Sequence, residues 1–356
     1  MAEAKVTAFT KCSEILLANP VPNALAHDTQ TIFVGTADGG VQALDKDISD
    51  AVWRTQLGGD IVSNIVATEA GTVVASNPVS AEEKIAESIL RSLSKETGLT
   101  IWTVRLPFSD QIFLDGTGKS ITAVAREGWA VAVEIRTGRI LWQTSPLGTI
   151  SARPNFSMYG IAFGTTDKQI FILSPETGSV LFQRAADFIP TAISNPTPET
   201  LVVGDERGKV ALLSLPTGKS IWKFKSGAAV SFVHLSKDGL LVTSLDNFIY
   251  LLSAYNGDVI WKRRLSGRVV EGAVVMQGHI ITLIYGENSA YLIDLKKGKI
   301  VDQIEEHTGN FVNQVPVVID GSRILITTPK SVEIFAIAGC NMATEKAASR
   351  MPPSKN

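Results

Sequence analysis

The sequence predicts an all-β fold, an eight-bladed β-propeller built from four-stranded antiparallel blades. The first observation behind this prediction is a turn glycine that recurs about every 40 residues, a spacing typical of repeat proteins. These glycines are Gly98, Gly138, Gly178, Gly218, Gly257 and Gly298. The second is an aromatic residue four positions after the turn, which is Trp53, Trp102, Trp142, Phe182, Trp222 or Trp261. Because one repeat cannot cover its own apolar faces, we expect the repeats to stack on one another.

The fifth repeat shows the plan of a blade. Its apolar segments are Pro190–Ser194, Leu201–Gly204, Val210–Ser214 and Ser220–Lys225. Short polar turns separate these segments, and Gly218 can adopt the positive φ that the last turn needs. No sustained helical period occurs outside one insertion. Four short strands in each repeat therefore indicate a propeller blade.

The two ends of the chain together complete the last blade. The final repeat has strand-like segments at Val315–Val318, Arg323–Thr327 and Ser331–Ala336, and no fourth. Ser13–Ala18 resembles the missing strand, with Leu16 at the aromatic position. Pairing it with the last segment closes the ring and leaves no open sheet edge between the ends, whereas a seven-bladed ring would leave both ends loose. We expect residues 1–12 to be an N-terminal segment, 13–340 the propeller, and 341–356 a disordered tail.

Two cysteines, Cys12 and Cys340, would lie on either side of this closure. Two alternatives are open for them. Both could be free thiols buried near the seam, as unpaired cysteines often are. They could instead form a disulfide that holds the ring shut, which would require an oxidising compartment.

The second repeat carries an insertion at residues 79–92, in the hairpin between its second and third strands. Acidic residues Glu82, Glu83 and Glu87 alternate there with apolar ones in a pattern compatible with a short amphipathic helix. The insertion could be a lengthened hairpin. It could also be a projecting contact for a partner, because loops on a rigid scaffold often carry binding.

Composition excludes several classes of function. The chain has 356 residues, of which 45% are hydrophobic and 19% charged, and its net charge is −2. This balance is that of a globular protein without the basic stripe of a nucleic-acid-binding surface. No apolar run is long enough for a membrane helix, and the first residues do not form a secretory signal. As written, the chain is expected to be cytoplasmic, or extracytoplasmic if a signal peptide has been removed.

No catalytic or metal-binding pattern occurs in the sequence. His27, His234, His279 and His307 fall in four different repeats, without the spacing of a metal site. No nucleophile elbow occurs, and neither cysteine has a histidine partner nearby in sequence. We therefore expect no enzyme activity from these residues.

Two rings of polar residues remain as candidates for binding. Positions expected to line the central channel are Asn23, Asn64, Gln111, Arg153, Thr191, Ser231, Glu271 and Gln314. Arg153 and Glu271 are the only charges among them, and could mark a small-ligand site at one mouth. The hairpin turns carry acids at equivalent positions, namely Asp38, Glu127, Asp167, Asp205, Asp246 and Glu287. These acids could serve turn formation, or could give one rim a negative potential that attracts a basic partner.

The repeat, a turn Thr-Gly followed four residues later by Trp, resembles the PQQ-binding-like (quinoprotein-type) β-propeller repeat over residues 13–340. The resemblance implies that each Trp docks between neighbouring blades. The chain departs from the pattern at Ser49, Phe182, Asp302 and Leu16. Phe and Leu could still fill an interblade pocket, whereas Asp302 could not, which makes the seventh interface the expected weak point.

The resemblance also bears on function. Quinone-dependent enzymes of this family carry insertions for PQQ and Ca²⁺ that the chain lacks, so we expect neither cofactor. In size and blade count the chain is similar to the scaffold branch, such as the propeller lipoprotein of outer-membrane assembly, although it lacks a lipid-attachment cysteine. We expect a monomeric, non-catalytic scaffold that binds a protein partner. The alternative is a small-ligand or quinone-binding enzyme or sensor that uses the channel mouth.

Overall fold

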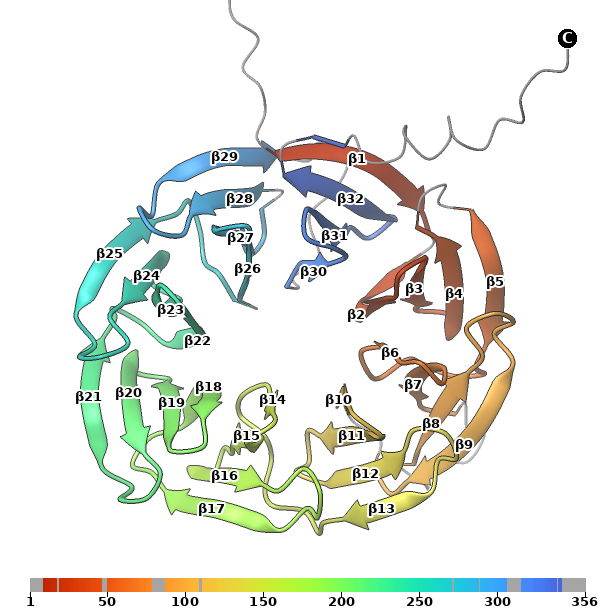
Figure 1. Ribbon diagram of the computed structural model, residues 1–356, viewed down its shortest axis with the longest axis horizontal. Coiled ribbons are helices and arrows are strands. Elements are labelled where there is room, and N and C mark those ends of the chain that lie inside the picture. Colours follow the sequence, from red (N-terminus) through yellow and green to blue (C-terminus); the bar gives the residue numbers. More distant parts are fainter. Residues whose placement is uncertain are drawn as a thin grey trace, which may run out of the picture.

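The computed structural model describes residues 9–17, 19–46, 50–78, 87–108, 111–270, 272–287, 289–305, 315–337 and 339–340. Within these ranges the chain forms eight four-stranded antiparallel sheets and no helix. Figure 1 shows the sheets arranged as blades around a central axis, with the first strand of each blade innermost and the fourth on the rim. The prediction of an eight-bladed propeller is confirmed. Within the same ranges there is no helix with the length and apolar character needed to span a membrane.

The strands follow one another in order around the ring. Blade one contains β2 (Pro20–His27), β3 (Thr31–Thr36), β4 (Gly40–Asp45) and β5 (Ala51–Gln56), and blade two contains β6 (Val66–Ala67), β7 (Thr72–Ser76), β8 (Ser88–Leu93) and β9 (Thr100–Leu106). Blade three contains β10 (Ile112–Thr117), β11 (Ser120–Ala125), β12 (Ala130–Glu134) and β13 (Ile140–Gln143), and blade four contains β14 (Asn155–Ser157), β15 (Gly160–Gly164), β16 (Gln169–Leu173) and β17 (Val180–Ala185). Blade five contains β18 (Pro190–Thr197), β19 (Thr200–Asp205), β20 (Lys209–Ser214) and β21 (Ser220–Lys225), and blade six contains β22 (Val230–Ser236), β23 (Gly239–Ser244), β24 (Phe248–Leu252) and β25 (Val259–Arg264). Blade seven contains β26 (Ala273–Met276), β27 (His279–Leu283), β28 (Ser289–Asp294) and β29 (Ile300–Glu305), and blade eight contains β30 (Val317–Val318), β31 (Arg323–Thr327), β32 (Ser331–Ile337) and β1 (Phe9–Leu16).

The N-terminal strand closes the ring, as predicted. β1 pairs antiparallel with β32, from Phe9 opposite Ile337 to Leu16 opposite Ser331. The strand begins at Phe9, so the predicted boundary at residue 13 falls inside it. Residues 1–8 and the predicted tail at 341–356 lie outside the described residues.

The register of β1 corrects one assignment. A bulge at Cys12 places Ser13 opposite Ile334, just as a bulge in β5 places Trp53 opposite Ala43. Ser13 therefore occupies the aromatic position of blade eight. Leu16 lies three residues further along and is 78% exposed, so it fills no interblade pocket. The prediction for Leu16 was wrong because β1 follows no turn glycine and has no aromatic residue at this position, so the sequence contains no marker of its register.

The two cysteines meet at this seam. Cys12 and Cys340 form a disulfide, with Cα atoms 5.4 Å apart and 328 positions between them in sequence. Of the two alternatives for these residues, the structure therefore has the disulfide. The bond joins the two ends of the ring at blade eight.

The blade-two insertion is shorter than predicted. Residues 88–92, assigned to it from the sequence, belong to β8, which pairs with β7 from Ser76 opposite Ile89 onward. Glu82, Glu83 and the predicted helix lie outside the described residues. Glu87 is described, and its carboxylate lies 3.5 Å from the exposed guanidinium of Arg105.

Five of the six tryptophans dock between blades, each on the turn glycine of the next blade. A Cβ built on that glycine would lie 2.4 to 2.8 Å from an indole carbon, so only glycine fits. The pairs are Trp53 with Gly98, Trp102 with Gly138, Trp142 with Gly178, Trp222 with Gly257, and Trp261 with Gly298. Each indole Nε1–H also donates to the carbonyl three residues before the glycine, at 2.6 to 3.0 Å.

Asp302 is explained by the way the ring closes. It stands at the aromatic position of blade seven, opposite Leu292. Blade eight has no turn between its third and fourth strands, because these come from opposite ends of the chain. An indole would therefore find no turn glycine to pack on. Instead, the Asp302 carboxylate accepts the backbone N–H of Phe9 at 3.1 Å, the first residue of the closing strand.

Candidate functional site: the channel mouth

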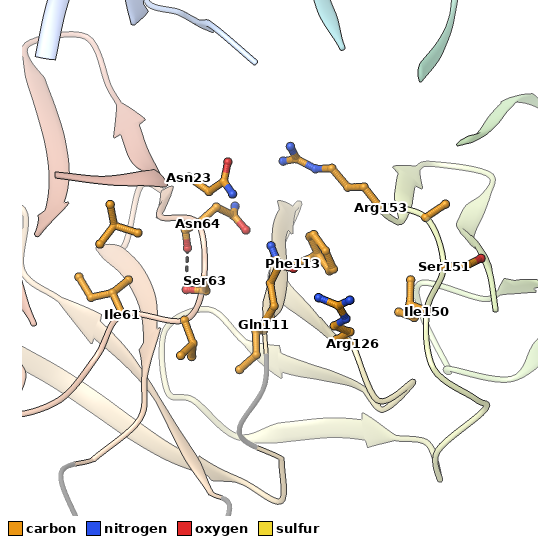
Figure 2. A pocket seen from close by; sticks show the side chains of 14 residues that line it. Asn23, Ile61, Ser63, Asn64, Gln111, Phe113, Arg126, Ile150, Ser151 and Arg153 are labelled. Carbon is orange, nitrogen blue, oxygen red and sulfur yellow. Dashed lines mark hydrogen bonds between the residues drawn. The ribbon is translucent and has the colours of Figure 1, made fainter. Parts of the chain in front are cut away.

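A cavity of 530 Å³ opens at one mouth of the channel, between blades one and four. We call it the mouth cavity. Its polar lining side chains include Asn23, Asn64, Gln111, Arg126, Ser151 and Arg153. In Figure 2, Arg126 of blade three and Arg153 of blade four lie on one side of the cavity and extend into it. Asn23 and Asn64 lie on the opposite side. Ile61, Ile150 and Phe113 supply apolar surface beside them.

Backbone hydrogen bonds within blade three and to blade four fix the segment that carries Arg126. Arg126 follows the buried strand β11; its N–H donates to the Gln111 carbonyl at 2.9 Å, and its own carbonyl accepts from Ile150 at 2.8 Å. Arg153 lies between the buried residues Ala152 and Pro154. Both side chains are exposed on these rigid supports. The arginines are therefore held on adjacent blades.

The described lining of the mouth cavity is positively charged. It includes both guanidinium groups and no carboxylate. The side chain of Asn64 is used structurally, because it exchanges two hydrogen bonds with the backbone of Leu114, at 2.8 and 2.9 Å. The arginines and Asn23 are the exposed polar groups of the site. Guanidinium groups recognise carboxylates or other oxyanions through paired N–H donors.

The structure describes one member of the predicted charge pair. Arg153 lines the mouth as predicted, whereas Glu271 lies outside the described residues. Arg126, a further charge at the mouth, was not predicted. It lies in the turn between β11 and β12, whereas the predicted channel lining consists of first-strand positions. An arginine directly before the repeated turn acid, here Glu127, was the available signal.

Further down the channel, the predicted polar ring joins neighbouring blades. A second cavity, of 520 Å³, is lined in part by Thr191 and Ser231. Thr191 Oγ1 donates to the Val230 carbonyl and Ser231 Oγ to the Val269 carbonyl, each at 2.6 Å. These hydroxyls therefore contribute to the scaffold. Gln314 lies outside the described residues.

Two of the turn acids, Asp205 and Asp38, are held within their own hairpins. Asp205 is 2% exposed and accepts the N–H groups of Arg207 and Lys209 at 2.9 and 2.8 Å. The Thr36 hydroxyl donates to Asp38 at 2.6 Å and lowers the pKa of that carboxyl. Such contacts are those of turn formation, and they favour that interpretation over a partner-attracting rim.

The three described histidines lie in different blades and form no metal site. Among the residues that the structure describes, no group of three or more His, Cys, Asp or Glu side chains could hold a metal ion. Burial lowers the pKa of His234, which lines the second cavity and stacks on Phe232. His307 lies outside the described residues.

Comparisons with known proteins assign the family. The chain is 25% identical to the outer membrane protein assembly factor BamB of Shewanella oneidensis over 81% of this chain and 78% of that protein. It resembles in fold the crystal structure of BamB from Moraxella catarrhalis, with a TM-score of 0.68, 16% identity, and coverage of 94% of this chain and 99% of that one. A tetrathionate hydrolase of Acidithiobacillus ferrooxidans is 22% identical over 41% of the chain and 36% of that enzyme. A family model described as outer membrane protein assembly factor BamB matches residues 86–229 and 206–338. Since these matches span more than half of the chain, it belongs to this family of PQQ-like repeat propellers.

Proposed function

We propose that the chain is a non-catalytic scaffold that binds a protein partner in outer membrane protein assembly. The observation that carries the proposal is the mouth cavity, where Arg126 and Arg153 present two guanidinium groups from adjacent blades. The choice of process is supported by the BamB relatives, which are named as outer membrane protein assembly factors.

The chemistry of the mouth favours an acidic segment of a protein. The Arg126 guanidinium can pair with a carboxylate through parallel N–H···O bonds, and the positive charge of both arginines speeds the encounter with an acidic surface. The buried residues Ile61 and Ile150 and the partly exposed Phe113 offer an apolar patch beside them. An apolar centre with charged residues at its edge is the usual anatomy of a protein interface. The expected partner therefore presents Asp or Glu next to an apolar side chain.

The proposal also implies that the protein acts outside the cytoplasm. This replaces the expectation of a cytoplasmic protein. Two observations support it. Structural disulfides such as Cys12–Cys340 persist in oxidising compartments and are rare in the cytoplasm. The relatives act, by their names, in outer membrane protein assembly.

A charge-reversal experiment in the native cell tests this function. Deletion of the gene should lower the amount of outer-membrane β-barrel proteins, and the wild-type chain should restore it. The double variant Arg126→Glu, Arg153→Glu should be folded yet fail to restore it. Arg139→Glu is the matched control, because Arg139 is an exposed arginine of blade three outside the mouth cavity, 3.5 Å from Glu134. Unchanged outer-membrane proteins after deletion would refute the proposed process, and full rescue by the double variant would refute the proposed site.

The proposal includes neither a quinone nor oligomerisation. Addition of PQQ with Ca²⁺ should leave the absorbance spectrum and the melting temperature of the protein unchanged, and light scattering should give the mass of a monomer. A stoichiometric, stabilising PQQ complex would favour the alternative of a cofactor-binding protein.

A further inference from the structure

The interface between blades four and five differs from the five interfaces that contain a docked indole. Its aromatic residue is Phe182, and no described atom lies within 4 Å of a Cβ built on the next turn glycine, Gly218. The backbone at Gly218 nevertheless has the same conformation as the others, with φ of 63° against 61° to 78°. The turn at Gly218 therefore has the same backbone conformation as the five turns on which an indole lies, and the space above it is open.

The hydrogen-bond acceptor for such an indole is also present. In the five filled interfaces the acceptor is the carbonyl three residues before the glycine. The equivalent group here is the Leu215 carbonyl, and among the described residues no backbone N–H donates to it. The Phe182 ring packs in the same cluster as Leu215 and has no N–H to offer. We call the space bounded by Phe182, Leu215 and Gly218 the indole slot.

The strand beside the indole slot is open to a partner. β17 has only Phe182 partly buried, and its other residues are exposed. Val180 and Leu181 are 46% and 59% exposed, which leaves apolar surface along the rim. Figure 1 shows β17 running along the rim toward the turn between β20 and β21, which contains Gly218. Arg184, at the far end of the strand, donates to the Gly218 carbonyl and holds this turn against β17.

No other part of the chain can supply the indole. The sequence has six tryptophans, and all of them lie in described residues. Five dock on turn glycines, and the sixth, Trp129, stacks on Phe108 in the cluster of blades two and three. An indole at this turn would therefore have to come from another molecule.

We propose that the indole slot receives a tryptophan side chain from a protein partner, on a surface separate from the mouth cavity. The ring would lie on Gly218, as five indoles of this chain lie on their glycines, and its N–H would donate to the Leu215 carbonyl. Val180 and Leu181 would contact the apolar residues that flank the tryptophan. Tryptophan is favoured at interface hot spots because it combines a large apolar surface with one donor.

The test uses the full chain and N-acetyl-tryptophanamide as the probe, followed by amide NMR. At millimolar probe the Gly218 and Leu215 amide signals should shift, while Gly178, already covered by Trp142, should not. N-acetyl-leucinamide should cause no such shift. Phe182→Trp should fill the slot from within, raise the melting temperature and abolish the shift, and Gly218→Ala should abolish it by placing a methyl group in the slot.

Three results would overturn the proposal. They are no shift at Gly218 with the tryptophan probe, an equal shift with the leucine probe, and an undiminished shift in folded Phe182→Trp. The proposal is independent of the mouth cavity, since Arg126→Glu and Arg153→Glu should leave probe binding unchanged.

Discussion

A pair of glycine substitutions tests whether the turn glycines are required by the docked indoles or only by backbone conformation. Gly257 and Gly218 have φ of 78° and 63° in equivalent turns. They differ in what an added methyl group would meet. At Gly257 a Cβ would lie 2.5 Å from Trp222 Cε3, whereas at Gly218 no described atom lies within 4 Å. Gly218→Ala is thus the matched control for Gly257→Ala.

The expected costs follow from two separate terms. A non-glycine residue in the left-handed region costs about 1 to 2 kcal/mol, and this term applies to both variants. Overpacking a filled site adds about 1 to 3 kcal/mol, and this term applies to Gly257→Ala alone. We expect losses of about 1 to 2 kcal/mol for Gly218→Ala and about 2 to 5 kcal/mol for Gly257→Ala.

Thermal and denaturant unfolding measure the difference. For 356 residues the unfolding entropy near the transition is roughly 0.7 kcal/mol per kelvin. The melting temperature should therefore fall by about 1 to 3 °C for Gly218→Ala and about 3 to 7 °C for Gly257→Ala. In a Trp222→Ala background, Gly257→Ala should cost only the conformational term, because the clash is gone. Equal losses at the two glycines, or an undiminished loss in that background, would refute the docking argument.

Three further predictions concern stability. Trp222→Ala should cost about 3 to 5 kcal/mol, because it empties a buried site and leaves the Ala254 carbonyl without its donor at 3.0 Å; an unchanged melting temperature would contradict this. Cys12→Ser should lower the free energy of unfolding by about 3 to 5 kcal/mol, because the disulfide with Cys340 constrains the unfolded chain. Reductant should lower the stability of the wild type to the same level, and a wild type insensitive to reductant would argue against the bond. Burial raises the pKa of Asp320, but hydrogen bonds from Ser322 and Arg323 outweigh it and hold that pKa below its ordinary value. The stabilisation by Asp320 is present above the unfolded pKa of about 4 and is lost as pH falls, so Asp320→Asn should cost about 1 to 2 kcal/mol at pH 7 and progressively less below pH 4. A cost independent of pH would contradict the assignment.

Much of the blade plan could be predicted because it is periodic and local. In blade five the predicted fourth strand, Ser220–Lys225, coincides with β21, and the predicted third begins one residue after the start of β20. Apolar content and turn residues act within a few positions of the chain, and repetition strengthens their signal. The prediction failed where the repeat pattern is incomplete. β1 has neither a turn glycine before it nor an aromatic residue at the docking position, so nothing in the sequence marked Ser13 rather than Leu16 as that position of blade eight.

The candidate site was only half visible in the sequence. Arg153 was found because it lies at a repeated first-strand position. Arg126 was not, because it lies in a turn 27 residues earlier, and only the side-by-side packing of blades three and four brings both into one cavity.

The sequence by itself determined the repeat, the four-stranded blades and the closure of the ring by the chain's first strand, because each of these follows from local apolar patterns and from a count of strands. Only the tertiary structure decided what lies across each interface. The sequence contains both Trp222 and Gly257, but not the fact that the indole of one blade covers the glycine of the next. The structure likewise explained Asp302, since its partner is the N–H of Phe9 at the other end of the chain. Contacts of this kind depend on how separate blades are placed in space, and no local pattern encodes that placement.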